Sequence, residues 1–246
     1  MDIYGFYKGN VFNAYEYMGA HTSKSGTLFR TYAPNASKVS VIGDFSGWDD
    51  IPMKPAADEN FYELTVGEAL EGMRYKYRIY DKNGNFIDHC DPYGYSMEIR
   101  PGTCSVIRSL KNYRFSDSEW MNRRTDCKDK AMNIYEVHLG SWRKETDEPG
   151  KWYNYAEIAD PLISYVKEFG YNFIEIMPLN EHPCDESWGY QSTGFFAPTS
   201  RYGTPAQLME FVDKCHRSNI GIIVDFIPVH FAVDHYGLTE YDGTHL

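Results

Sequence analysis

The chain has 246 residues, 42% hydrophobic and 24% charged, which is enough apolar material to bury one large core or two ordinary ones. Its 35 acidic side chains outnumber 24 basic ones, and the net charge of −11 disfavours nucleic acid and anionic membranes, because both attract positive charge. The sequence contains no apolar run near the roughly 18 residues of a spanning helix and no signal-peptide pattern at the N-terminus, so we expect a cytoplasmic protein.

Short strands separated by turns are predicted over residues 25–110. Lys38–Val41 and Tyr62–Val66 alternate between apolar and polar residues, and Arg74–Ile79 places its aromatic and aliphatic side chains on one face and its basic ones on the other. Asn83-Gly84 predicts a tight hairpin turn, since both residues tolerate positive φ. This pattern is typical of an antiparallel β-sandwich.

The pattern changes after a polar stretch, which divides the chain. We expect a lead-in segment at 1–24, the β-sandwich module at 25–110, a linker at 111–130 and a second domain at 131–246. In that second domain strands alternate with helices, which indicates parallel strands joined by crossover helices.

The second domain begins with a strand at Ile134–His138. A helix with an apolar stripe from Ile158 to Phe169 follows, with Asp160 and Pro161 as its expected N-cap and first residue and Gly170 as its end. Phe173–Met177 is the second strand, and the loop at 178–203 is long enough to suggest a functional role.

A second helix and a third strand complete the pattern. Thr204–Gln207 is a capping box with proline at the first helical position. Gly221–Asp225 is an apolar run that predicts a buried parallel strand ending in a carboxylate. Such an order suits a (β/α)8 barrel or a doubly wound sheet, and the absence of a glycine-rich phosphate-binding loop favours the barrel.

Functional side chains of both architectures gather at the carboxyl ends of the parallel strands. His138 follows the first strand, the loop containing Glu181 to Gln191 follows the second, and Asp225 and His230 follow the third. A carboxylate at the end of an apolar strand is costly to bury unless other groups satisfy it, so Asp225 is a strong site candidate.

The motifs in these loops resemble those of the glycogen (1,4-α-glucan) branching enzymes of the α-amylase superfamily. The resemblance is carried by Ile134–Trp142, by Glu181-His182-Pro183, by Ser187-Trp188-Gly189-Tyr190-Gln191 and by Thr193–Pro205. Upstream, Tyr15–His21, Gly43–Trp48 and Asp91-Pro92-Tyr93 resemble the starch-binding-type module that precedes such barrels. The resemblance implies an immunoglobulin-like β-sandwich followed by the first three strands of an incomplete (β/α)8 barrel.

What the resemblance implies for function is a retaining transglycosidase that cleaves an α-1,4 bond and transfers the glucan chain to a 6-hydroxyl. Its partner would be an α-glucan, either glycogen or a starch-like polymer. In such enzymes the residue matching Tyr190 stacks on the sugar beside the scissile bond, and those matching Asp225 and His230 organise the same subsite. Gln191 is a further candidate, and Val229 departs from the glycine or asparagine usual before the motif histidine.

The implied reaction needs a nucleophile and a general acid, two carboxyl groups about 5–5.5 Å apart. In the family they follow the fourth and fifth barrel strands, and no Asp or Glu before Leu246 matches those motifs. We therefore expect this chain to contain no catalytic residue and to be inactive alone, as a truncated branching enzyme. Two alternatives stay open: another α-amylase-superfamily hydrolase, trehalose-releasing or debranching, and a non-catalytic glucan-binding or regulatory protein.

Other residues carry weaker functional hypotheses. Trp48 is a possible glucan contact in the sandwich, although packing of a hairpin is the more common role for such a residue. Glu181 and His182 lack a partnered second histidine, so we expect neither a metal site nor a cofactor. The five cysteines are expected to be free thiols in a reducing compartment: Cys90, Cys104, Cys127, Cys184 and Cys215.

Overall fold

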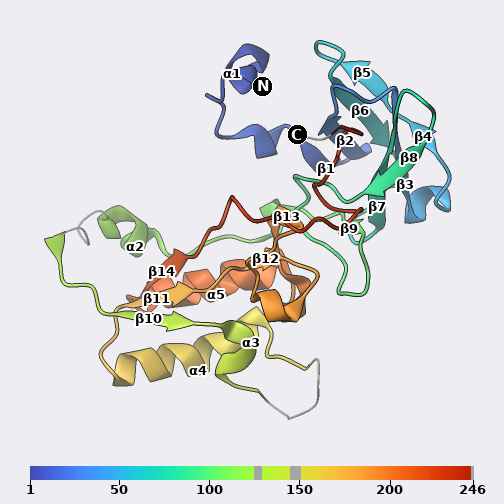
Figure 1. Cartoon of the computed structure of the whole chain (residues 1–246). Coiled ribbons are helices and arrows are strands. Elements are labelled where there is room, and N and C mark those ends of the chain that lie inside the picture. Colours follow the sequence, from blue (N-terminus) through green and yellow to red (C-terminus); the bar gives the residue numbers. More distant parts are fainter. Residues whose placement is uncertain (125–128, 145–150, 245–246) are drawn as a thin grey trace. The chain divides into compact units, whose positions relative to one another are not determined.

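The computed structural model describes residues 1–124, 129–144 and 151–244, so Cys127 lies outside the described residues (Figure 1). The chain forms two compact units. Unit 1 consists of residues 1–109, 192–197 and the described residues from 231 onward, and unit 2 consists of residues 110–191 and 198–230. The domain bounds expected from the sequence stay a prediction. No helix among the described residues has the length and apolar character needed to cross a membrane.

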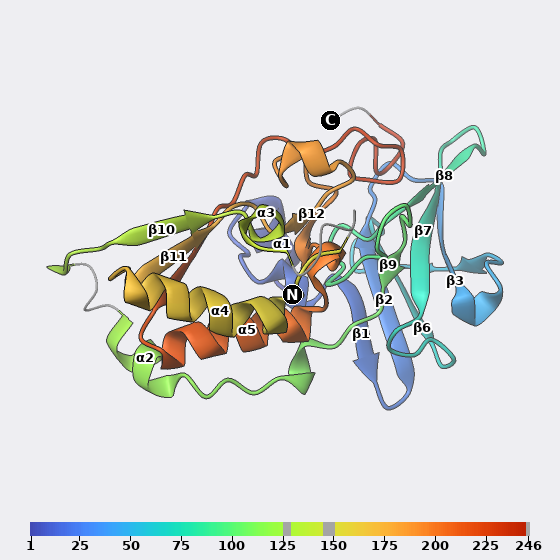
Figure 2. The ribbon, with the colours of Figure 1, turned by 90° about the horizontal axis from the view of Figure 1, so that it is seen from below.

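Unit 1 is built from two antiparallel sheets that share one core. One sheet has the order β1-β2-β6-β5, and the other has the order β4-β3-β7-β8 with β9 also pairing with β7. Figure 2 shows the strands of this unit. Side chains from both sheets, among them Phe29, Val41 and Tyr77, meet in a single buried cluster, as in a β-sandwich. The elements are α1 (Ile3–Tyr7), β1 (Gly19–Ser23), β2 (Gly26–Tyr32), β3 (Lys38–Gly43), β4 (Ile51–Pro52), β5 (Lys54–Ala56), β6 (Phe61–Val66), β7 (Arg74–Tyr80), β8 (Phe86–His89), β9 (Ser105–Val106) and β13 (Gly194–Pro198).

The predicted strands of the sandwich are confirmed, with one change at the hairpin. In β7, Tyr75, Tyr77 and Ile79 are buried while the residues between them are more exposed, as the alternation predicts. The loop to β8 spans residues 81–85 rather than the two residues expected of a tight turn. Gly84 alone has positive φ, and the Asp81 carboxylate accepts the backbone N–H groups of Asn83 and Asn85, so a side chain closes the turn.

The C-terminal described segment belongs to the sandwich unit, although it lies beyond the predicted barrel strands in sequence. Tyr241 is buried in the sandwich core, and its hydroxyl lies 2.6 Å from Thr31 Oγ1. The Asp242 carboxylate accepts a hydrogen bond from the Asn35 side chain at 2.7 Å. Nothing in the local pattern of residues 231–244 predicts this packing, because it depends on partners about 200 positions away.

Asp91 of the Asp-Pro-Tyr motif is a buried carboxyl in the sandwich. It accepts hydrogen bonds from the hydroxyls of Tyr75 (2.7 Å) and Tyr77 (3.3 Å) and from the backbone N–H of Tyr93 (2.8 Å). Burial raises the pKa of Asp91 to about 6, even though these hydrogen bonds favour the charged form. The motif therefore fixes a polar centre within an otherwise apolar core.

We expect Asp91 to make the stability of the sandwich pH-dependent. Its pKa is about 6 in the folded state against an ordinary value of 3.8, so the folded chain retains a proton that the unfolded chain loses between these values. Stability relative to an Asp91→Asn variant should therefore fall as the pH rises from about 4 to 6, by about 3 kcal/mol, and stay level above pH 6. Urea unfolding at several pH values measures this difference, with Glu68→Gln as an exposed-carboxylate control. A difference that does not change with pH would contradict the expectation.

Unit 2 contains a three-stranded parallel sheet of order β10-β11-β14. Helices α4 and α5 lie on one face of it (Figure 1). Ile158 of α4, Phe211 of α5 and Ile174 of β11 belong to the same core cluster. The helices and strands are α2 (Ser118–Arg123), β10 (Ile134–Val137), α3 (Leu139–Trp142), α4 (Tyr155–Glu168), β11 (Phe173–Ile176), β12 (Asn180–Glu181), α5 (Pro205–Arg217) and β14 (Gly221–Val224). The described strands form an open sheet and do not close a barrel.

Helix α4 begins at Tyr155, six residues before the Pro161 start expected from the Asp-Pro pair, so that prediction is wrong. Asn154 is the N-cap, and it forms a capping box with Glu157: the Asn154 side chain accepts backbone N–H groups while the Glu157 carboxylate accepts the Asn154 N–H. Pro161 lies inside the helix. The capping box expected at Thr204–Gln207 is confirmed at the start of α5.

The third strand is less buried than its apolar sequence suggests. Gly221 is buried, but Val224 is 51% exposed. The reason is that β14 is an edge strand of the three-stranded sheet, so one of its sides has no neighbouring strand among the described residues. The expectation of a fully buried strand is therefore wrong.

Candidate functional site

Tyr190 and Asp225 form a hydrogen-bonded pair at the carboxyl ends of the parallel strands. Asp225 follows β14 directly, and its backbone N–H donates to the carbonyl of Ile176 at 3.0 Å, which extends the pairing with β11 by one residue. The Tyr190 hydroxyl donates to Asp225 Oδ2 at 2.9 Å. This bond raises the pKa of Tyr190, as do burial and the nearby carboxylates. Both side chains are half-buried, so they remain accessible to a ligand.

Two more carboxylates lie on the strands behind this pair. Glu136 in β10 and Glu175 in β11 are paired in register, and both contribute to the raised pKa of Tyr190. Glu136 is exposed and Glu175 half-buried. They lie on the opposite face of the sheet from the helices, because side chains alternate along a strand.

The loop that positions Tyr190 depends on two unusual backbone conformations. Trp188 has φ 54° and ψ 24°, a left-handed conformation that costs a residue other than glycine roughly 1–2 kcal/mol. Gly189 has φ +90°, and a Cβ atom at this position would lie 2.4 Å from the carbonyl oxygen of Pro178. Only glycine fits at Gly189, so the path of the loop requires the glycine of the Trp-Gly-Tyr sequence.

A buried ion pair holds the same loop in place. Arg201 Nη1 lies 2.8 Å from Glu181 Oε1, and the exposed fractions of the two side chains are 2% and 6%. Arg201 Nε also donates to Asp185 at 2.7 Å, and Asp185 begins the short 3₁₀-helix η5 (Asp185–Ser187) that leads to Trp188. Glu181 is thus engaged by a cation of the chain, and no group of three metal-ligating side chains occurs among the described residues.

The remaining predicted site residues have other surroundings. His138 is half-buried at the end of β10, with Nδ1 3.0 Å from Ser141 Oγ, and burial lowers the pKa of His138. His230 and Gln191 are exposed. Trp48 is half-buried in unit 1, with the Arg74 guanidinium 5.8 Å from its ring centre, which resembles structural packing.

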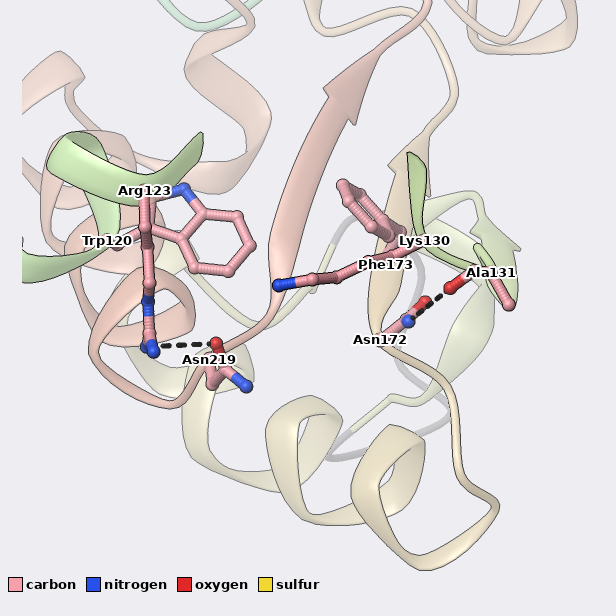
Figure 3. A pocket seen from close by; sticks show the side chains of 7 residues that line it. All are labelled: Trp120, Arg123, Lys130, Ala131, Asn172, Phe173 and Asn219. Carbon is pink, nitrogen blue, oxygen red and sulfur yellow. Dashed lines mark hydrogen bonds between the residues drawn. The ribbon is translucent and has the colours of Figure 1, made fainter. Parts of the chain in front are cut away.

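A cavity of about 150 Å³ lies at the opposite, amino-terminal edge of the same sheet (Figure 3). It is lined by Trp120 and by residues that precede β10, β11 and β14, among them Ala131, Asn172 and Asn219. Arg123 donates to Asn219 at 3.1 Å, and Asn172 donates to the Ala131 carbonyl at 2.9 Å. None of the predicted site residues lines this cavity.

The described cysteines are free thiols, as expected. Cys90, Cys104 and Cys215 are buried, and burial raises the pKa of each to about 12. The exposed Cys184 donates to the Glu186 carboxylate at 2.9 Å, a neighbour that does not activate a thiol.

Two residues that shape the site were not assigned a role by the sequence analysis. Trp188 was noted only as part of a motif, although a tryptophan between Ser187 and Gly189 in a long loop is itself a signal. Arg201 was likewise noted only within a motif, Thr193–Pro205, and its pairing with Glu181, 20 residues away, follows no secondary-structure period.

Two family models match the chain. Residues 17–94 match "Carbohydrate-binding module 48 (Isoamylase N-terminal domain)", and residues 143–242 match "Alpha amylase, catalytic domain". These matches agree with the two observed units of architecture, a β-sandwich and part of a strand–helix catalytic domain, and they confirm the expected fold class.

Solved structures of known enzymes share this fold. A pullulanase from Bacillus acidopullulyticus matches with a TM-score of 0.67 and 23% identity, covering 87% of this chain and 30% of that one. A pullulanase from Paenibacillus barengoltzii, complexed with maltotetraose, matches with a TM-score of 0.68 and 20% identity, covering 92% and 42%.

Sequence relatives are more specific. The chain is 43% identical over 251 residues to the 1,4-alpha-glucan branching enzyme GlgB of Bacillus caldolyticus, covering 99% of this chain and 37% of the relative. It is 44% identical over 247 residues to the enzyme of the same name from Fusobacterium nucleatum, covering 99% and 40%. The chain thus spans about two fifths of the length of these curated relatives. Over nearly its whole length the chain is therefore similar to 1,4-alpha-glucan branching enzymes, and its second part matches the alpha-amylase catalytic domain.

Proposed function

We propose that this chain supplies part of the glucan-binding surface of a branching enzyme, which cleaves an α-1,4 bond and transfers the released chain to a 6-hydroxyl. The observation that carries the proposal is the Tyr190–Asp225 pair at the carboxyl edge of the parallel sheet. A tyrosine offers an apolar ring face and a polar edge, which together match the apolar face and hydroxyl rim of a sugar. The nearby carboxylate accepts hydrogen bonds from hydroxyl groups.

Each predicted residue has a role in this proposal. Tyr190 stacks against a glucosyl ring, and Asp225 holds the Tyr190 hydroxyl and a sugar hydroxyl. His230 and Gln191 extend the same surface, and both are exposed and so accessible to a polymer. Trp48 is a separate possible contact in the sandwich.

The partner in this proposal is a neutral α-glucan, and nucleic acid and membranes are not partners. The net charge of −11 supports this choice, because stacking and hydrogen bonding to a neutral polymer need no positive charge. A cytoplasmic location completes the proposal. Cell fractionation that recovered the chain with membranes would contradict it.

Replacing Tyr190 tests the proposed subsite. We expect Tyr190→Ala to weaken binding of the 246-residue chain to glycogen by about threefold to tenfold, because ring stacking contributes about 0.5–1.5 kcal/mol. Tyr190→Phe keeps the ring and loses only the hydrogen bond to Asp225, so its binding should lie closer to that of the unaltered chain. Retardation in native gels containing glycogen measures the affinity.

The control is Asp49→Ala, which removes an exposed carboxylate of the sandwich. It should leave retardation unchanged at low and high salt. Equal retardation of Tyr190→Ala and the unaltered chain would count against the subsite.

A further inference from the structure

A cavity of about 430 Å³ in unit 2 lies beside the loop that carries Tyr190, and none of the proposed subsite residues lines it. Its walls come from the segment after β10, including His138 and Trp152, and from the loop after β11, including His182 and Trp188. This volume lies within the range of small-molecule sites, about 300–1,000 Å³. The cavity therefore has room for a ligand at the same edge of the sheet as Tyr190.

Trp188 has two features that folding alone does not favour. Its side chain is 55% exposed, and its backbone is left-handed, with φ 54°. Strained backbone occurs preferentially at functional sites, where surrounding structure holds it in place. The Trp188 ring centre lies 6.1 Å from that of His138, so the two rings border the same space. Trp152 supplies a second indole in the lining.

The charges around the cavity balance. Lys144 and Arg201 are opposed by Asp185 and Glu186, so the lining favours neither an anion nor a cation. Arg201 Nη2 is buried and has no hydrogen-bond partner among the described residues. A buried donor without a partner is costly, and Arg201 belongs to the lining of this cavity.

The two histidines of the lining are suited to hydroxyl groups. Burial lowers the pKa of both His138 and His182, which favours the neutral imidazole. His182 Nδ1 lies 2.8 Å from the Asn180 carbonyl oxygen, so Nδ1 carries the proton and donates to it. Nε2 of neutral His182 is then an acceptor.

We propose that this cavity binds glucosyl units of the same α-glucan as a second subsite, with Trp188 as its stacking surface. The inference rests on the proposed function, because it takes the ligand to be the glucan. Trp188 and Tyr190 are separated only by Gly189, whose left-handed conformation turns the chain between them. A single glucan chain is thus contacted by both rings of one loop.

Removing the Trp188 ring tests this subsite with maltoheptaose as the probe. Trp188→Asn is the suitable variant, because asparagine tolerates the left-handed backbone and the loop keeps its path. We expect the dissociation constant of maltoheptaose, measured by calorimetry on the 246-residue chain, to rise about threefold to tenfold. Trp188→Tyr keeps a stacking ring and should restore most of the affinity. Phe12→Ala, which removes an aromatic ring that is 89% exposed in unit 1, is the control and should have no effect.

The results separate this subsite from the Tyr190 subsite. Weaker binding in both Trp188→Asn and Tyr190→Ala supports the two subsites together. If Trp188→Asn leaves the affinity for maltoheptaose unchanged while Tyr190→Ala lowers it, the cavity is not a glucan subsite. The proposed function then still stands. Loss in Trp188→Asn alone supports the cavity and counts against the Tyr190 subsite. As a second readout, maltoheptaose should shift the indole N–H resonances of Trp188 and Trp152, and unshifted resonances would overturn the cavity even if the chain binds the sugar elsewhere.

Discussion

The purified 246-residue chain is expected to leave the iodine-complex spectrum of amylose unchanged, which means that it forms no branches. A retaining transglycosidase needs a nucleophile and a general acid about 5–5.5 Å apart on either side of the glycosidic bond. At the carboxyl edge of the described sheet, Asp225 is engaged by Tyr190 and Glu181 is engaged by Arg201. Positioning a sugar without a nucleophile and an acid leaves the bond with no covalent route and no protonated leaving group.

The control for this assay is the Bacillus caldolyticus relative, whose name describes branching activity and which should shift the spectrum under the same conditions. Measurable branching by the 246-residue chain would overturn the expectation that it contains neither the nucleophile nor the general acid. The candidates for these two catalytic carboxyl groups would then be Glu136 and Glu175, which are paired in register on neighbouring strands near Tyr190. Glu136→Gln and Glu175→Gln variants would identify which of them takes part.

Arg201→Ala is expected to destabilise unit 2 by about 3–5 kcal/mol, because it leaves the buried Glu181 carboxylate without its cation. The same change removes the bond from Arg201 to Asp185, which precedes the turn that carries Trp188. Glucan binding should therefore weaken along with stability. Urea unfolding followed by tryptophan fluorescence measures the first effect, and gel retardation measures the second.

Arg217→Ala is the matched control, since the Arg217 side chain is 51% exposed in its pair with Asp213 and should contribute about 0–1 kcal/mol. A double variant, Arg201→Met with Glu181→Gln, removes both charges and should be less destabilised than the sum of the single variants. If Arg201→Ala lowered the free energy of unfolding by less than about 1 kcal/mol, the ion pair would not be what holds the loop.

Local sequence patterns were sufficient to predict most helices and strands and to place Tyr190 and Asp225 at the same edge of the sheet. The strand at Arg74–Tyr80 follows from alternation, and the start of α5 follows from its capping box, because both depend on neighbours within a few residues. Asp225 and Tyr190 were predicted to share one edge because the carboxyl ends of parallel strands meet there. The start of α4 was predicted wrongly although its signal, the capping box of Asn154 and Glu157, is also local. The Asp160-Pro161 pair is a second local signal for a helix start, and the prediction followed that pair.

Tertiary structure alone decided the features that depend on distant partners. The pairing of Arg201 with Glu181, the packing of Tyr241 against Thr31 and the exposure of Val224 at a sheet edge follow no period in the sequence. The left-handed Trp188 is stabilised by surrounding contacts and not by its own preference, since only such contacts hold a residue other than glycine in that conformation. Local patterns were enough to predict that Tyr190 and Asp225 share one edge of the sheet, whereas the cavity beside Trp188 depends on the folded loop, because its lining comes from segments that are far apart in the sequence.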